Sequence, residues 1–123
     1  MRFIDSNVLA YAFYSNVASK RCQEIIKEGG IINCVNLIEA FNIISYETSA
    51  EYAVKAVRSL LKSNLKIVNV NVALIFESLK RATKYKKLKF IDLLHYTTAL
   101  LYNCNEVVSY DSDFDNLEIK RVT

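Results

Sequence analysis

The chain of 123 residues has no proline and only two glycines, the adjacent pair Gly29-Gly30. Linkers and disordered tracts are usually rich in such residues, so the sequence favours neither. No apolar run approaches the ~18 residues that a membrane span needs. Charged Arg2 and Asp5 interrupt the start, where a signal peptide would be apolar. We therefore predict one domain over residues 1–123, located in the cytoplasm and without a membrane partner.

Cysteine and histidine are also scarce. Three widely spaced cysteines, Cys22, Cys34 and Cys104, form no Cys-x-x-Cys pair, and His95 is the only histidine. This pattern argues against a disulfide framework and a zinc site, and it is typical of a reducing compartment. We interpret His95 as a packing residue or a support for another side chain, with proton transfer as the alternative.

Hydrophobic residues, in contrast, make up 52% of the chain, which is enough to bury a core. Short β-branched runs alternate with stretches of helical period. The expected strands are Phe3-Ile4 with its flanks, 31–35, 66–70, 106–110 and 119–122. The expected helices cover residues 8–14, 17–28, 36–48, 50–63, 72–85 and 92–102, with Asn36 and Asn71 as N-caps.

This alternation predicts an α/β fold, a doubly wound and mostly parallel five-stranded sheet with helices on both faces. The strand order 3-2-1-4-5 fits right-handed crossovers. Asp5 leaves strand 1 and Asp111 leaves strand 4 at the carboxyl edge of that sheet. The helices that carry Glu39 and Asp92 begin at the same edge, so four acids are expected to meet in one crevice.

Four ionised carboxylates repel one another, and a divalent cation would compensate that repulsion. Oxygen ligands without histidine or cysteine favour Mg²⁺ or Mn²⁺ over zinc. An open site of this kind suits metal-assisted hydrolysis of phosphodiesters. Each acid also has a simpler interpretation. Asp5 and Asp92 could cap helices, Glu39 could complement a helix dipole, and Asp111 could belong to a solvated acidic turn with Asp113 and Asp115.

Four segments together resemble the PIN-domain ribonucleases, and among them the VapC-type toxins of prokaryotic toxin–antitoxin pairs. The segments are Phe3-Ile4-Asp5-Ser6-Asn7-Val8-Leu9, Asn36-Leu37-Ile38-Glu39-Ala40, Phe90-Ile91-Asp92-Leu93-Leu94-His95-Tyr96-Thr97-Thr98-Ala99 and Val107-Val108-Ser109-Tyr110-Asp111-Ser112-Asp113-Phe114-Asp115. The resemblance covers nearly the whole chain. It implies a PIN-like domain that acts as a Mg²⁺- or Mn²⁺-dependent endoribonuclease, forms a homodimer and is neutralised by a small VapB-type antitoxin.

The resemblance also assigns roles to residues. It implies Asp5, Glu39, Asp92 and Asp111 as the catalytic and metal-binding acids, with Asp113 assisting. Ser6 and Asn7 match a small polar pair that supports the first acid. Two positions depart from the family pattern, since Ser109 stands where threonine is commoner and Leu93 where alanine is frequent. Neither departure removes a ligand.

The basic stretch before Asp92 has two interpretations. Lys84, Lys86, Lys87 and Lys89 could track RNA phosphates beside the acids, or they could be a solvated helix end. Of three rival functions, the first two each lack a required acid. A phospho-acceptor module needs an acid after strand 3, where this chain has Asn71. A haloacid-dehalogenase-like phosphatase needs one at position 7, which is Asn7. The third alternative is a PIN-domain protein outside a toxin–antitoxin pair, in RNA processing or RNA binding.

Overall fold

The computed structural model describes residues 1–123 and contains the predicted sheet. Its five strands are all parallel and lie in the order β3-β2-β1-β4-β5. They are β1 (Arg2–Ile4), β2 (Ile31–Asn33), β3 (Lys66–Val68), β4 (Glu106–Val108) and β5 (Lys120–Val122). The chain leaves β1 for β2 on one side and later returns to place β4 on the other. The strand order therefore reverses between β1 and β4, and parallel sheets bind ligands at such a switch point.

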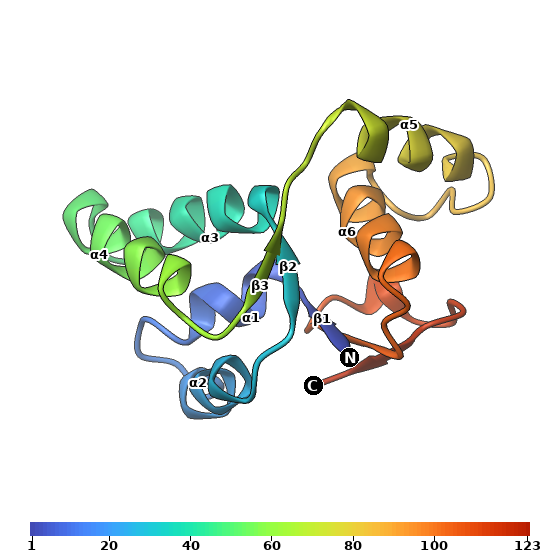
Figure 1. Ribbon diagram of the computed structural model, residues 1–123. Helices are drawn as coiled ribbons and strands as arrows, with labels where there is room; N and C mark the ends of the chain where they lie inside the picture. Colours follow the sequence, from blue (N-terminus) through green and yellow to red (C-terminus); the bar gives the residue numbers. More distant parts are fainter.

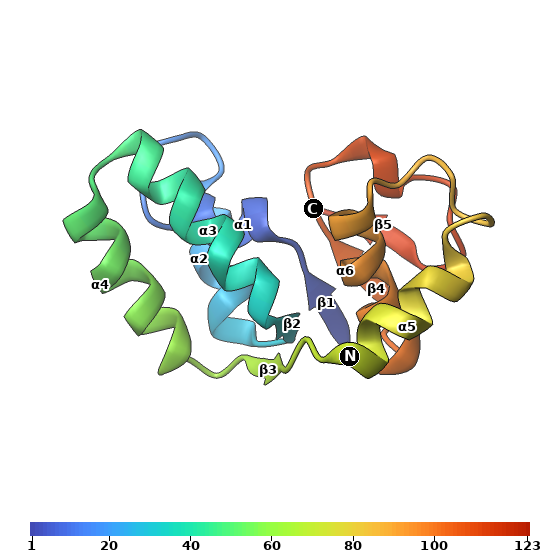
Figure 2. The ribbon, with the colours of Figure 1, turned by 90° about the horizontal axis from the view of Figure 1, so that it is seen from above.

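Helices cover both faces of this sheet, as Figures 1 and 2 show, with α1 to α4 on one face and α5 with α6 on the other. They are α1 (Ser6–Tyr11), α2 (Ser19–Glu28), α3 (Cys34–Glu47), α4 (Ala50–Leu61), α5 (Val72–Arg81), α6 (Phe90–Leu101) and the short 3-10 helix η1 (Ser112–Phe114). None of these helices is both long and apolar enough to cross a membrane.

The strands supply side chains to two hydrophobic cores in alternation. Ile4, Ile32 and Val108 pack with α1 to α4. Their chain neighbours Phe3, Ile31 and Val107 pack with α6 and the loop before it on the opposite face. Successive residues of a strand point to opposite faces, so the two consecutive apolar residues of β1, β2 and β4 are buried on opposite sides of the sheet. The two cores hold the sheet between the helix layers and fix the position of its carboxyl edge.

The start of α3 differs from the prediction. Asn36 was expected as the N-cap, but the cap is Asn33, so Cys34 and Val35 are helical rather than part of β2. The Asn33 side chain accepts hydrogen bonds from the backbone N–H groups of Val35 (3.0 Å) and Asn36 (3.2 Å). The Asn36 side chain returns one from the backbone N–H of Asn33 (2.8 Å), which completes a reciprocal capping box. The strand predicted over residues 31–35 therefore ends at Asn33, the first residue in it whose side chain can cap a helix.

Other predicted helices also have different ends in the structure. The first two helices were expected over 8–14 and 17–28, but α1 ends at Tyr11 and α2 begins at Ser19. The prediction for Asn71 is confirmed, since it caps α5 by accepting from the Leu74 N–H (3.0 Å). The same helix ends at Arg81 rather than Tyr85, so Lys84 to Lys89 lie in a loop.

The helical period of the sequence predicts an apolar, core-facing side for the helices over 50–63, 72–85 and 92–102, but several residues of those sides are exposed. Small side chains, Ala53, Ala56 and Ser78, occupy the buried positions of α4 and α5 together with leucines. Small residues let helices approach closely, and larger neighbours are then displaced to the helix flank. The exposed residues are Val54, Leu61, Ile75, Leu79 and Leu101.

Candidate functional site

The carboxyl edge of the sheet brings the predicted acids together. Asp5 follows β1 directly, and the acidic loop from Asp111 follows β4. Ligand atoms of Asp5, Glu39 and His95 all lie within 4.8 Å of one another. The same holds for a second group, Asp92, Asp111 and Asp113. The two groups are close enough for the charges of Asp5 and Glu39 to act on Asp92.

Asp5 is buried, with 5% of its surface exposed, and both of its carboxylate oxygens accept hydrogen bonds. Oδ1 accepts from the Ser6 N–H (2.8 Å), so Asp5 also caps α1, as the simpler interpretation had it. Oδ2 accepts from the Ser109 hydroxyl (2.6 Å). Burial raises the pKa of Asp5 above its ordinary value despite these hydrogen bonds. A buried carboxylate held at both oxygens has a fixed orientation.

Glu39 reaches the site from the second turn of α3, not from the first turn as predicted, because the helix begins at Cys34. Its Oε1 accepts hydrogen bonds from the Ser6 hydroxyl and from His95 Nε2, both at 2.6 Å. Burial alone would raise the pKa of Glu39, but these two donors outweigh it and lower the pKa. Glu39 is therefore stabilised as a carboxylate even without a metal.

Asp92 lies in the first turn of α6, and Lys89 rather than Asp92 occupies the N-cap position. Burial, followed by repulsion from Asp5, raises the pKa of Asp92 to about 6, to which Asp111 and Glu39 add. Asp111 caps η1 by accepting from the Asp113 N–H (2.9 Å). These three acids are only partly buried. A cation between them would relieve the repulsion that raises the pKa of Asp92.

Ser109 joins the two groups of acids. Its hydroxyl donates to Asp5 and accepts from the backbone N–H of Asp111 (3.0 Å). Of the other two residues predicted to support the first acid, Ser6 directs its hydroxyl to Glu39 rather than to Asp5. The amide oxygen of Asn7 accepts from the Tyr110 N–H (3.4 Å), so it holds the loop after β4 instead of an acid.

Sequence reasoning missed two side chains of the site, Asn33 and Asn36. Both have no exposed surface, and both donate hydrogen bonds toward the groups that hold Glu39. The signal that could have found them is the Asn-x-x-Asn spacing, which resembles a capping box, inside an otherwise apolar run.

The predicted RNA-contact lysines fall into two pairs. Lys84 forms an ion pair with Glu118 (2.9 Å), and Lys87 donates to the backbone oxygen of Asp115 (3.1 Å). Lys86 and Lys89 are exposed and form no ion pair. All four lie in the loop that leads into α6, a few residues before Asp92.

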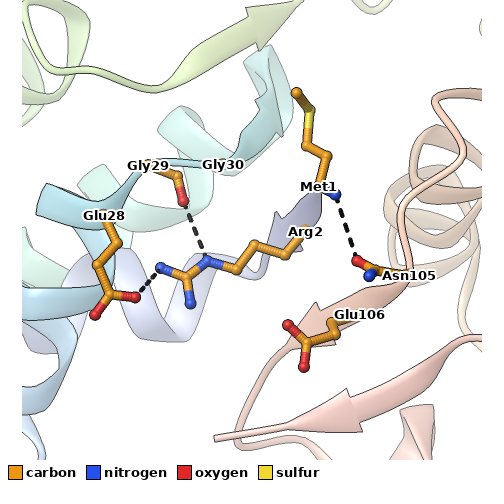
Figure 3. A pocket seen from close by; sticks show the side chains of 7 residues that line it. All are labelled: Met1, Arg2, Glu28, Gly29, Gly30, Asn105 and Glu106. Carbon is orange, nitrogen blue, oxygen red and sulfur yellow. Dashed lines mark hydrogen bonds and ion pairs between the residues drawn. The ribbon is translucent and has the colours of Figure 1, made fainter.

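A pocket of about 530 Å³ lies at the opposite edge of the sheet, where β1 and β4 begin (Figure 3). The Arg2 guanidinium in it donates through Nε and Nη2 to the backbone oxygens of Gly29 and Ile25 and to the Glu28 carboxylate. These contacts hold the end of α2 against β1. We therefore assign this pocket a structural role and place the functional site at the carboxyl edge.

The donor set at the carboxyl edge fits Mg²⁺ or Mn²⁺. Five carboxylates converge there, and none of the three free cysteines belongs to either group of potential ligands. Carboxylate oxygens are the ligands these hard cations prefer. The residues that would hold such an ion are Asp5, Glu39, Asp92, Asp111 and Asp113.

The fold is that of solved toxin structures. VapC20 from Mycobacterium tuberculosis, described as a toxin that cleaves the sarcin–ricin loop, superimposes with a TM-score of 0.83 at 14% identity, over 99% of this chain and 98% of that one. A toxin–antitoxin complex from Klebsiella pneumoniae gives 0.74 at 20% identity, over 100% and 97%. VapBC2 from Rickettsia felis, bound to a promoter DNA fragment, gives 0.73 at 16%, over 99% and 96%.

Proteins of curated function include none that matches this sequence significantly. The family model described as the PIN domain, however, matches residues 2–120, almost the entire chain. With the parallel 3-2-1-4-5 sheet and acids at its switch point, this match establishes that the chain belongs to the PIN-domain family.

Proposed function

We propose that the protein is a metal-dependent endoribonuclease that hydrolyses RNA phosphodiester bonds, with Asp5, Glu39, Asp92 and Asp111 as its acidic site and Asp113 assisting. The observation that carries this proposal is the meeting of five carboxylates at the switch point of a PIN-family sheet. The simpler interpretations do not account for two of these acids, because Glu39 lies beyond the first turn of α3 and Asp92 caps no helix.

Mg²⁺ or Mn²⁺ would be held by these acids, and when bound it supplies a nucleophilic hydroxide and neutralises charge on the phosphate. The protein's own contribution is to hold the ligands in place. Asp5 is fixed at both oxygens and Glu39 at one. Asp92 and Asp111 stand on the more open side, where a phosphate could approach. The adjoining loop with Lys86 and Lys89 supplies positive charge that would track the RNA backbone.

The test is a cleavage assay on purified protein with structured and unstructured RNA, in Mg²⁺, in Mn²⁺ and with a chelator. We expect cleavage that depends on the metal and that disappears in Asp5→Asn and Asp92→Asn. Cleavage that persists in the chelator, or that survives both substitutions, would contradict the proposal.

We further propose that a small antitoxin neutralises the protein. Two of the structural neighbours are toxin–antitoxin complexes by their descriptions. An apolar groove of about 260 Å³ between α3 and α4, lined by Leu37, Ile38, Phe41 and Val57, suits an apolar segment of such a partner. Ile38 directly precedes Glu39 on α3, so a partner in the groove would contact the helix that carries one of the acids. A short gene that overlaps the start of this one, with a product that binds and inhibits the protein, would support this role. Without one, a PIN-domain role in RNA processing is favoured.

A homodimer is the remaining part of the proposal. One side of α5 exposes four apolar residues at helical spacing, Val72, Ile75, Phe76 and Leu79, which no other element covers. We propose that a second copy of the chain covers this face. Light scattering should give twice the chain mass of 14.1 kDa, and Phe76→Glu should return the monomer mass. A monomer at all concentrations would exclude the dimer.

A further inference from the structure

We propose that His95 is a positioning residue that holds one oxygen of the Glu39 carboxylate, Oε1, so that the other, Oε2, is the atom presented to the metal. This inference rests on the proposed function, in which Glu39 is a ligand. His95 has no exposed surface, and Nε2 lies 2.6 Å from Glu39 Oε1. Its ring nitrogens and Glu39 share one buried network with Asn33, Asn36 and Ser6.

The hydrogen bonds of Asn33 determine which ring nitrogen of His95 carries the proton. Asn33 Oδ1 accepts from two backbone N–H groups, so its Nδ2 is the donor. Nδ2 lies 3.1 Å from His95 Nδ1 and 3.1 Å from Thr98 Oγ1, whose own proton goes to the Leu94 carbonyl. His95 Nδ1 must therefore accept. The proton is on Nε2 and is donated to Glu39 Oε1 at 2.6 Å, while Asn36 Nδ2, itself a donor, lies farther from Nε2 at 3.4 Å and donates to Ser6.

This proton placement excludes His95 as a metal ligand. A ring nitrogen binds a metal through its lone pair, and neither nitrogen has one free. Nδ1 accepts from Asn33, and Nε2 donates to Glu39. Although ligand atoms of His95, Asp5 and Glu39 lie within 4.8 Å of one another, only the carboxylates can bind an ion. His95 therefore acts through Glu39.

Two chains of hydrogen bonds, which we call arms, reach Glu39 Oε1. The first runs from Asn33 through His95, and the second runs from Asn36 through Ser6. Asn36 Oδ1 accepts from the Asn33 N–H, so its Nδ2 donates to Ser6 Oγ (2.8 Å). Ser6 then has its proton free to donate to Glu39 Oε1 (2.6 Å). Oε1 thus accepts two buried hydrogen bonds, while Oε2 accepts none from the protein. Both arms begin in the capping box of α3.

The arrangement ties Glu39 to both sides of the sheet. His95 comes from α6 and Glu39 from α3, and these helices cover opposite faces (Figure 2). The two side chains meet above the carboxyl ends of β1 and β2. Groups that orient ligands in this way are often nearly as important as the ligands themselves, and their loss typically weakens metal binding roughly 10–100-fold.

The experiment measures Mn²⁺ affinity of the metal-free protein by isothermal titration calorimetry, without RNA. His95→Gln places an amide N–H where Nε2 was, whereas the shorter His95→Asn replaces only Nδ1. We expect His95→Asn to bind Mn²⁺ roughly 10–100-fold more weakly and His95→Gln to stay within about threefold of the parent. A residue that merely fills space would make the two variants alike. Ser6→Ala, which withdraws the other donor without touching α6, should also weaken binding.

Two controls separate the possible failures. Thr98→Val removes the other acceptor of Asn33 on the same helix and should leave Mn²⁺ affinity unchanged. Glu39→Gln should abolish the dependence on His95. If Glu39→Gln weakens binding while His95→Asn and Ser6→Ala do not, positioning by His95 is wrong and the metal site stands. If Glu39→Gln binds like the parent, the proposed site itself is wrong and the positioning role falls with it.

Discussion

The two groups of acids differ in how the protein holds them. Asp5 and Glu39 are bound by neighbouring hydroxyls, an imidazole and a backbone N–H, most of them buried. Asp92 accepts no hydrogen bond from another side chain, and its strongest influences are burial and the charge of Asp5. The first group is ordered by the fold alone. The second is under repulsion, and a cation would stabilise it.

The pKa values express this difference. The donors around Glu39 lower its pKa, while Asp92, about equally withdrawn from solvent, has a pKa raised to about 6. Similar burial therefore gives opposite results according to whether hydrogen-bond donors are present. We call Asp5 and Glu39 the inner pair and Asp92, Asp111 and Asp113 the outer acids. We infer that the inner pair determines where an ion binds, and that the bound ion then relieves the repulsion among the outer acids. Three predictions test this contrast, and a fourth concerns the loop beside the outer acids.

The largest effect is expected on catalysis when one acid of the inner pair loses its charge. Asp5→Asn should reduce kcat at least about 10³-fold, equivalent to about 4 kcal/mol, because a fixed anionic ligand is lost. Asp113→Asn, on the open side, should cost only about tenfold. Single-turnover RNA cleavage at saturating Mn²⁺ measures both.

The matched control for this pair is Glu106→Gln, the same carboxylate-to-amide change at the opposite edge of the sheet. It should leave the cleavage rate unchanged. Equal losses in Asp5→Asn and Asp113→Asn would show that the inner and outer acids do not differ in the way we infer.

Metal binding should produce the next largest effect, on stability. At 100 times its Kd, an ion that binds only the folded chain adds ~2.7 kcal/mol to the free energy of unfolding and raises Tm by roughly 10 °C. Thermal unfolding with Mn²⁺ and with chelator measures this shift. The shift should be smaller in Asp92→Asn and absent in Asp5→Asn. A full shift in Asp5→Asn would place the ion elsewhere.

A smaller effect concerns pH in the metal-free protein. The pKa of Asp92 is about 6 in the fold against an ordinary 3.8, so the folded state binds its proton more tightly than the unfolded state. Stability from this group is therefore greatest below about pH 4 and falls as pH rises to about 6. Asp92→Asn should remove the penalty and stabilise the chelated protein at pH 7.5 by about 1–2 kcal/mol, after allowance for solvent screening. Urea unfolding from pH 4 to 8 checks this, and a variant that is less stable than the parent would contradict it.

The sheet and the meeting of the acids could be predicted because both follow from chain order. Short apolar runs identified the strands, and right-handed crossovers left few orders for them. Asp5 and Asp111 leave adjacent strands, so their approach needed no knowledge of side-chain packing. The confirmed order 3-2-1-4-5 carried this part of the prediction.

The support around the acids could not be predicted in the same way. Asn33 follows two isoleucines and precedes a valine two residues later, so local pattern placed it in the middle of a strand, whereas it is the last residue of β2 and the N-cap of α3. Its role depends on His95, 62 residues away, which α6 brings across the sheet edge. The prediction of which helix residues face the core was partly wrong for a related reason. Close packing at Ala53 and Ala56 decides which of their neighbours on α4 are exposed. The support around the acids and the exposure of helix residues both depend on contacts between distant parts of the chain, which the periodicity of the sequence does not reveal.

The smallest expected effect lies outside both groups of acids, in the loop before α6. Lys86 and Lys89 form no ion pair, whereas Lys84 is paired with Glu118. If the free pair tracks RNA phosphates, Lys86→Ala with Lys89→Ala should raise KM a few-fold, leave kcat nearly unchanged and reduce the salt dependence of RNA binding by about two phosphate contacts. Lys62→Ala with Lys120→Ala removes the same charge far from the acids and should change neither quantity. Equal effects from the two pairs would mean that net charge attracts RNA to the protein, and that this loop has no specific part in guiding a phosphate to the outer acids.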